Sequence, residues 1–114
     1  MINKIFFIFT LTLSLFASEG NVDKGLTYYK YIIRPMIDIK GSEFTKKHLT
    51  KEWKDLFKNS AEGFKNEYSV INSDFATFLK SKKFNKIAPD LEAFFIHYAK
   101  DSSVSPQCGD DTID

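Results

Sequence analysis

The most regular hydrophobic pattern lies near the C-terminal end of this 114-residue chain. Four large apolar residues follow Pro89 at the i, i+3, i+4 and i+7 spacing of one helix face: Leu91, Phe94, Phe95 and Tyr98. Pro89 suits the first position of a helix, and Lys100 suits the C-terminal end of the helix dipole. The pattern therefore predicts an amphipathic helix that begins at Pro89.

The segment that starts near Asn21 has a similar pattern. Asn21 or Asp23 can cap a helix whose apolar side is a stripe: Leu26, Tyr29, Ile32 and Ile33. Pro35 disfavours the helical conformation of the residue before it, Arg34. The sequence predicts a helix that ends before this proline.

Shorter apolar stripes lie between these two segments. Thr50 can cap a helix that carries Trp53 and ends near Asn59, and Ser73 can cap another. A weak turn is expected around Phe64, where Gly63 disfavours a helix. No segment alternates between polar and β-branched residues over a strand length. The fold class predicted is all-α, a small helical bundle with long first and last helices packed together and short helices between.

The first 17 residues have the composition of a secretory signal peptide. Lys4 precedes an apolar run that is short for a membrane span, and Ala17 supplies a small residue at the expected cleavage position. An uncleaved membrane anchor is the alternative. Residues 1–17 therefore predict export, to a bacterial periplasm or out of the cell.

The remaining composition fits one domain, over residues 18–101, whose core is rich in aromatic side chains. Without Lys4, fifteen basic residues stand against fifteen acidic ones, so the charge balance indicates neither a nucleic acid nor an anionic membrane as partner. Eight Phe, five Tyr and Trp53 follow residue 17, and such side chains bury large areas each.

The last residues, 102–114, are polar and are expected to form a disordered tail. The single cysteine of the chain, Cys108, lies in this tail. One cysteine cannot form an internal disulfide, so Cys108 is either incidental or joins two chains in a disulfide-linked dimer.

The order of the predicted helices resembles that of class I cytochromes c. In that family a glycine and then an aromatic residue lie on the first helix, and an aromatic on the last helix packs against it. Gly25 and Tyr29 match the first two positions, and the predicted C-terminal helix matches the last. The resemblance covers most of residues 24–101, and residues 44–59 are similar to stretches of small exported proteins of cytochrome type. It implies a cytochrome c-like helical domain.

The haem attachment sequence of that family is missing. Its two cysteines and its histidine fall, in this chain, within the stretch 33–37, which reads Ile-Arg-Pro-Met-Ile. Covalent haem of the ordinary kind is therefore excluded, because the domain has no thiol to form the thioether bonds. We expect Ile33, Met36 and Ile37 to pack into the volume that a porphyrin occupies in the family, since an unfilled cavity would be destabilising.

Three side chains remain as possible axial ligands of a haem held without covalent bonds: His48, His97 and Met36. His97 lies about 100° from the centre of the apolar face of its helix, so it is expected at the flank of the core or near the surface. His48 lies in a polar, lysine-rich segment. Structural or solvated roles are the expectation for both histidines, and no zinc-site spacing links them to Cys108.

No catalytic motif is present: the chain has no G-x-S-x-G, no H-E-x-x-H and no glycine-rich phosphate loop. Lysine and aromatic residues interleave in residues 45–54 and 81–86, and these stretches are either solvated helix faces or a patch for an acidic protein. The sequence thus predicts an exported, non-enzymatic module that binds an unknown periplasmic partner. The alternative is an electron-transfer protein that binds haem non-covalently.

Overall fold

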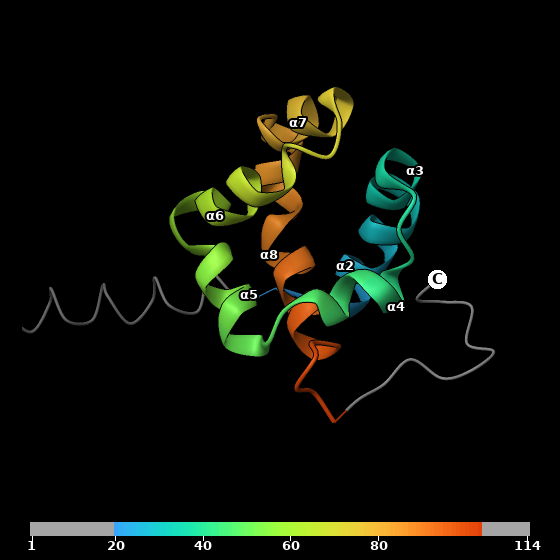
Figure 1. The fold of residues 1–114 in the computed structure, drawn as a ribbon, viewed down its shortest axis with the longest axis vertical. Helices are drawn as coiled ribbons and strands as arrows, with labels where there is room; N and C mark the ends of the chain where they lie inside the picture. Colours follow the sequence, from blue (N-terminus) through green and yellow to red (C-terminus); the bar gives the residue numbers. More distant parts are fainter. Residues whose placement is uncertain (1–19, 104–114) are drawn as a thin grey trace, which may run out of the picture.

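The computed structural model describes residues 20–103, and every regular element in this range is helical (Figure 1). The elements are α2 (Val22–Tyr28), the π-helix η1 (Tyr29–Ile33), α3 (Arg34–Ile37), α4 (Gly41–Phe44), the 3₁₀-helix η2 (Thr45–Lys47), α5 (Thr50–Leu56), α6 (Lys58–Tyr68), α7 (Ser73–Leu79) and α8 (Lys82–His97). The predicted all-α class is confirmed. The predicted signal peptide at 1–17 and Cys108 lie outside the described residues.

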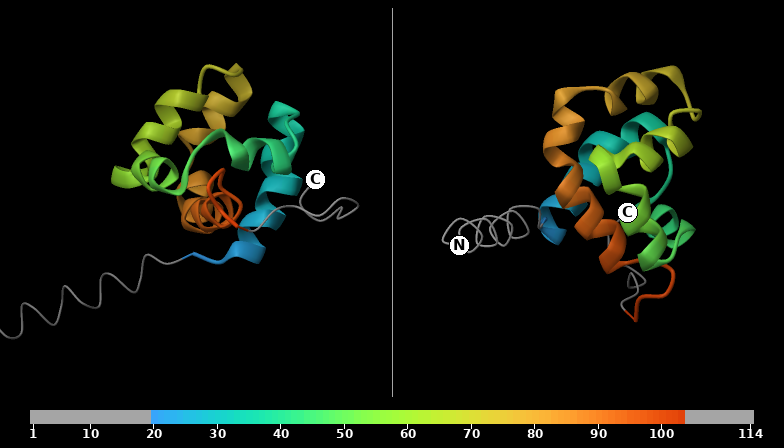
Figure 2. Two further views of the ribbon diagram at one scale, coloured as in Figure 1. Left: turned by 60° about the horizontal axis from the view of Figure 1, so that its bottom comes forward. Right: turned by 90° about the vertical axis from the view of Figure 1, so that its left-hand side faces the viewer.

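The last helix, α8, forms the centre of the arrangement. It runs through the middle of the molecule, with α2 and α3 on one side and α5 and α6 on the other, while α7 covers one end (Figures 1 and 2). None of the helices between residues 20 and 103 combines the length and the apolar composition that crossing a bilayer requires.

The first helical run continues through Pro35, so the predicted end before this residue is wrong. Residues 29–33 form a π-helical turn, in which the Arg34 N–H donates to the carbonyl of Tyr29, five residues back. A proline has no N–H to donate, and its ring collides with the preceding turn of a regular α-helix. The wider π turn accommodates the proline, and the run ends at Asp38, which has a left-handed φ of 55°. The cap predicted at Asn21 is confirmed, because its side chain accepts from the Lys24 N–H at 2.9 Å.

The long first and last helices pack together at Gly25. This residue is buried, and a Cβ placed on it would collide with the Asp90 carbonyl and with the Cβ of Phe94. Close approach of two helix backbones at this point therefore requires glycine. One turn further on, the ring of Tyr29 contacts those of Phe94 and Phe95, at centroid distances of 5.8 and 6.0 Å.

The helix predicted to begin at Pro89 in fact begins two turns earlier, at Lys82. Ser81 is its N-cap and accepts from the Phe84 N–H at 3.2 Å, and Pro89 lies inside the helix. The apolar face extends back through Ile87 and Phe84, both buried, which explains why the helix continues on the N-terminal side of the proline. The lysine-rich stretch 81–86 consequently forms the cap and first turns of α8.

The short middle helices differ from their predicted limits in similar ways. Thr50 is the first residue of α5 and not its cap, and α7 is capped by Asn72, which accepts from the Phe75 N–H at 2.8 Å. The sequence predicts only a weak turn around Phe64, but the structure has the helix α6 there, which buries Phe64 and Tyr68 in the core. Burial of two aromatic rings outweighs the low helix propensity of Gly63.

Aromatic rings dominate the core, as the composition predicts. Eight of the eleven largest fully buried side chains in the described residues are aromatic: Tyr29, Phe44, Trp53, Phe64, Phe75, Phe84, Phe94 and Phe95. Ile33 is fully buried, Ile37 is 8% exposed, and Met36 packs against the core from its edge. Ile33, Met36 and Ile37 thus serve as packing surface, as expected.

Candidate functional site

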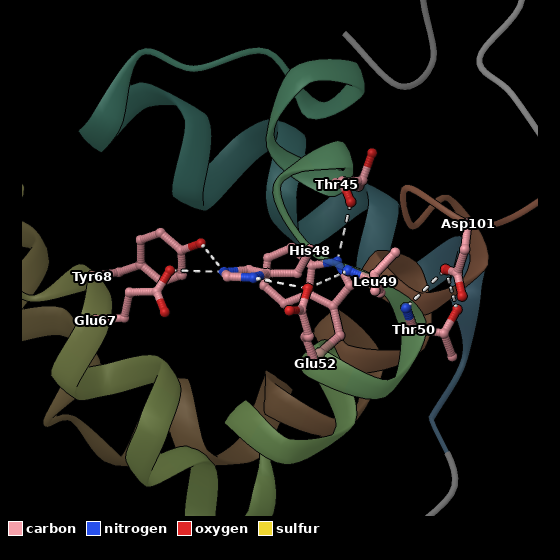
Figure 3. A network of polar contacts seen from close by, with 9 residues as sticks. Thr45, His48, Leu49, Thr50, Glu52, Glu67, Tyr68 and Asp101 are labelled. Carbon is pink, nitrogen blue, oxygen red and sulfur yellow. Dashed lines mark hydrogen bonds and ion pairs between the residues drawn. The ribbon is translucent and has the colours of Figure 1, made fainter.

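His48, in the link between η2 and α5, lies in a network of polar side chains (Figure 3). Its Nε2 is 2.7 Å from a carboxylate oxygen of Glu67 and 3.0 Å from the hydroxyl of Tyr68, both at the end of α6. Its Nδ1 is 3.6 Å from a carboxylate oxygen of Glu52. The ring also meets Trp53 edge to face, with 4.8 Å between centroids. The side chain of His48 is 19% exposed, so it is mainly structural rather than solvated.

This network does not have the geometry of a metal site. Glu52 and Glu67 approach opposite nitrogens of the imidazole, and so they do not converge on one point from which a cation could be held. Residues 20–103 contain no group of three or more His, Cys, Asp or Glu side chains that could hold a metal ion. Burial, followed by the neighbouring Glu67 carboxylate, raises the pKa of Tyr68 far above its usual value. The phenol therefore stays protonated at neutral pH and acts as a hydrogen-bonding group.

The other two candidate haem ligands lie elsewhere. His97 is exposed in the last turn of α8, with its ring 4.7 Å from that of Tyr98. Met36 is in α3, where its carbonyl accepts a hydrogen bond of 3.0 Å from the side chain of Asn72, next to α7. The end of α8 and the start of α5 are at the opposite end of the molecule from α3 and α7 (Figure 1). The structure does not bring Met36 together with either histidine, and the haem alternative gains no support from this arrangement.

The segment around His48 also holds the end of the described chain. The Lys100 N–H donates to the carbonyl of His48 at 3.0 Å, and the ammonium of Lys46 donates to the carbonyl of Ala99 at 3.3 Å. Asp101 accepts from the N–H and the hydroxyl of Thr50, at 2.8 and 2.9 Å, and these two bonds lower the pKa of its carboxyl group. A residue from beyond α8 thus caps α5. No local sequence signal could reveal this pairing, because its partners are 51 residues apart.

A second candidate is a set of exposed lysines at the start of α8, here named the lysine surface and defined as Lys80, Lys82, Lys83 and Lys86. None of the four forms an ion pair with a carboxylate of residues 20–103. The first turn of α8 holds two of these lysines and no acidic residue. A cation at a helix N-terminus opposes the dipole and is unfavourable by about 0.3–1 kcal/mol. Local rules are most often broken where function requires it, so these lysines are candidates for binding.

A third candidate is a pocket of about 280 Å³ between the start of α6 and the middle of α8. Its walls are Phe57, Ser60 and Ala61 on one side, and Asn85, Ala88, Pro89 and Glu92 on the other. Three consecutive residues beside it, Asn59, Ser60 and Ala61, have left-handed φ values of 55°, 59° and 61°. Each such non-glycine residue costs about 1–2 kcal/mol, and strained backbone of this kind clusters at functional sites.

Glu92 is the acidic group of this pocket. Burial raises the pKa of its carboxyl group, and the positive charge of Lys54 acts in the opposite direction. In the sequence, nothing distinguishes Glu92 from any other carboxylate in the first turn of a helix. The pocket could not be foreseen, because it requires α6 to turn left-handed and α8 to begin two turns before Pro89.

Comparison of the chain with protein-family models, with curated proteins and with solved structures gave no match. The resemblance to class I cytochromes c therefore stays a prediction. What the structure defines is the class: a small all-helical domain built on the crossing of its first and last helices.

Proposed function

We propose that this protein is an exported, non-enzymatic binding module, cytochrome c-like in arrangement and without covalent haem, that docks an acidic protein through its lysine surface. The observation that carries the proposal is the set of four exposed lysines at the start of α8 that have no carboxylate partner among residues 20–103. Unpaired charges of one sign attract a partner of the opposite sign and speed its association.

The position of the lysine surface supports this use. Basic residues in the first turn of a helix are unfavourable for the helix itself, and none of the four is offset by an internal ion pair. An acidic partner would supply the missing negative charge at the positive end of α8. The buried side of the same turns, Phe84 and Ile87, fixes the helix so that the lysines face outward on a rigid element.

The polar network around His48 supports binding rather than catalysis. Its imidazole, its two carboxylates and the Tyr68 phenol are used to join the start of α5 to the end of α6. A protonated phenol and carboxylates that face opposite ring nitrogens leave no pair of groups aimed at a common reacting atom. The network therefore fits a structural role, in which it joins α5 to α6.

The proposal is tested by charge reversal with a matched control. Immobilised chain lacking residues 1–17 is exposed to a periplasmic extract, and retained proteins are identified by mass spectrometry. Acidic proteins should be retained by the wild type and released by added salt, because the contact is electrostatic. The triple variant K82E/K83E/K86E should lose them. The control variant K24E/K40E/K47E, with the same change in net charge at exposed lysines elsewhere, should keep them.

Retention of the same proteins by K82E/K83E/K86E would contradict the proposal. The visible absorption spectrum of the purified chain separates it from the electron-transfer alternative. A Soret band in stoichiometric amount that His48→Ala or His97→Ala abolishes would support a non-covalent haem protein instead.

A further inference from the structure

The pocket between α6 and α8 has mainly apolar walls. Phe57 and Ala61 lie on one side, and Ala88 and Pro89 lie on the other. An apolar cavity of roughly 150 Å³ is large enough for a benzene ring. The volume here is about 280 Å³, so the pocket can accept an aromatic ring together with a short side chain.

One charged group faces this apolar space. Glu92 is half-buried, and it has no hydrogen bond and no ion pair with any residue between 20 and 103. The positive charge of Lys54 acts on Glu92 only from beyond ion-pair distance. A carboxylate that loses water without gaining a hydrogen-bonded partner is unfavourable, and groups of this kind are normally paired in folded proteins. A positively charged ligand would supply the partner. The raised pKa of Glu92 has the same cause, loss of water at the pocket wall.

The backbone of α8 offers one further hydrogen-bond acceptor beside the pocket. Asn85 lies two helical turns before Glu92, on the same face of α8, and its carbonyl receives no hydrogen bond from Pro89, which has no N–H. The side-chain oxygen of Asn85 is already used, since it accepts from the ammonium of Lys65 at 3.1 Å. A carboxylate and a carbonyl together select a ligand that donates hydrogen bonds, and only the carboxylate demands positive charge.

We propose that this pocket binds a small organic cation, an amine whose apolar body lies between Ala61 and Pro89 and whose ammonium group pairs with Glu92. This site is separate from the lysine surface, and its test does not depend on a protein partner. The charge of the site also argues for a cation over an anion, because its one charged group is the Glu92 carboxylate.

The probe for this site is 2-phenylethylamine, titrated into the folded chain lacking residues 1–17. Isothermal titration calorimetry measures affinity, and two-dimensional NMR locates the site. We expect saturable binding, with shifts concentrated at Ala61, Ala88 and Glu92. Phenylacetate has the same ring and a negative charge, so it should not bind. These two ligands are compared on the same unaltered protein, which makes the comparison independent of any effect of mutation on folding.

Variants then test the role of each wall. Glu92→Gln keeps the size of the side chain and removes its charge, and it should weaken binding of 2-phenylethylamine at least about tenfold. Ala88→Phe, which fills the pocket, should abolish binding. Glu43→Gln removes an exposed carboxylate on α4 and should leave the affinity unchanged. Absence of saturable binding at millimolar amine, equal binding of phenylacetate, or an unaltered affinity in Glu92→Gln would each overturn the proposal.

Discussion

Trp53 and Phe95 stack with 4.6 Å between their ring centroids and 29° between their planes. The contact joins α5 to α8, and both side chains are fully buried. Phe95 also lies 5.3 Å from the ring of Phe44 and 5.7 Å from that of Phe64, so one residue of α8 contacts rings from three other helices. This cluster of rings therefore links α4, α5, α6 and α8 in the interior of the domain.

Because Phe95 is at the centre of the cluster, Phe95→Ala should lower the free energy of unfolding by about 3–5 kcal/mol. Urea unfolding followed by tryptophan fluorescence measures the change. Tyr31→Ala is the control, since Tyr31 is 69% exposed and its loss should change stability by less than about 0.5 kcal/mol. An effect of Phe95→Ala as small as that of the control would show that Phe95 is not in the core.

Gly25→Ala should separate the first and last helices. The added methyl group meets the backbone of Asp90, which cannot rotate away as a side chain can. We expect a net destabilisation of about 1–3 kcal/mol, despite the higher helix propensity of alanine. Thermal unfolding measures it, with Gly63→Ala as the matched control. At Gly63 the nearest atoms, at 3.1 Å, belong to Leu56, and a side-chain methyl is among them, so a smaller effect is expected. Equal stability of Gly25→Ala and the wild type would contradict the close approach of the first and last helices at Gly25.

The sequence correctly predicts burial at positions where apolar residues follow the regular spacing of one helix face. Leu91, Phe94 and Phe95 share a face of a regular helix, and all three are fully buried. Ile33 is likewise buried because it continues the stripe from Tyr29. Burial of such residues can be predicted without knowing which helix packs against them, since any partner would cover the same apolar face.

Pro35 and Pro89 are not the helix boundaries that the sequence predicts. Proline is a helix boundary only if the chain has no local means of accommodating it. Before Pro35 a π turn removes the conflict, and before Pro89 the buried Phe84 and Ile87 maintain the helix. The π turn depends on backbone hydrogen bonding that the spacing of residues does not encode. Phe84 and Ile87, in contrast, continue the helical spacing of Leu91 and Phe94 to the N-terminal side of Pro89, so this part of α8 has a signal in the sequence.

The candidate sites are harder to predict from the sequence than the core, because their residues come from parts of the chain that are far apart. His48 was identified as a residue of interest, but its partners Glu67 and Tyr68 come from another helix. The pocket depends on left-handed values at Asn59, Ser60 and Ala61, and no glycine marks that turn. Most of the lysine surface is the exception, because Lys82, Lys83 and Lys86 lie in the stretch 81–86, which is basic in the sequence itself.

Ser60→Gly should stabilise the protein. Ser60 is exposed and has a φ of 59°, a region in which glycine is not strained. Relief of about 1–2 kcal/mol of strain, less the greater chain entropy of glycine, predicts a gain of up to about 1 kcal/mol. Ser69→Gly is the control, because Ser69 has a right-handed φ of −67° and should lose stability. Chemical denaturation compares the two, and a loss in both variants would argue against the left-handed turn.

Asp101→Asn should change how stability depends on pH. The two bonds from Thr50 lower the folded-state pKa of Asp101 below its ordinary value of 3.8. A lowered pKa means that the charged form stabilises the fold above pH 3.8 and that this contribution is lost as the pH falls through the lowered pKa. The variant should therefore be less stable than the wild type at neutral pH, and the difference should shrink in acid.

Urea unfolding at a series of pH values measures this difference. Thr50→Ser keeps both donors and should follow the wild-type curve, whereas Thr50→Val removes the hydroxyl donor and should lie between the wild type and Asp101→Asn. A difference between Asp101→Asn and the wild type that stays constant from neutral pH to acid would show that the Asp101 charge does not contribute.

Glu92→Gln should raise stability at neutral pH while it weakens amine binding. Burial raises the folded-state pKa of Glu92 above its ordinary value of 4.5, so the folded state binds more protons than the unfolded state between these two values. Stability therefore falls as the pH rises from 4.5 through the raised pKa, and glutamine removes this loss. The expected result is a higher urea midpoint than the wild type at pH 7 and a similar one in acid, with Glu43→Gln unchanged at both.

Glu92 would then lower the stability of the free protein and strengthen ligand binding. This combination is expected at a binding site, because residues that serve function there often cost stability. A lower midpoint for Glu92→Gln at pH 7 would mean that the carboxylate has a stabilising partner, and the amine would then not be needed to supply one.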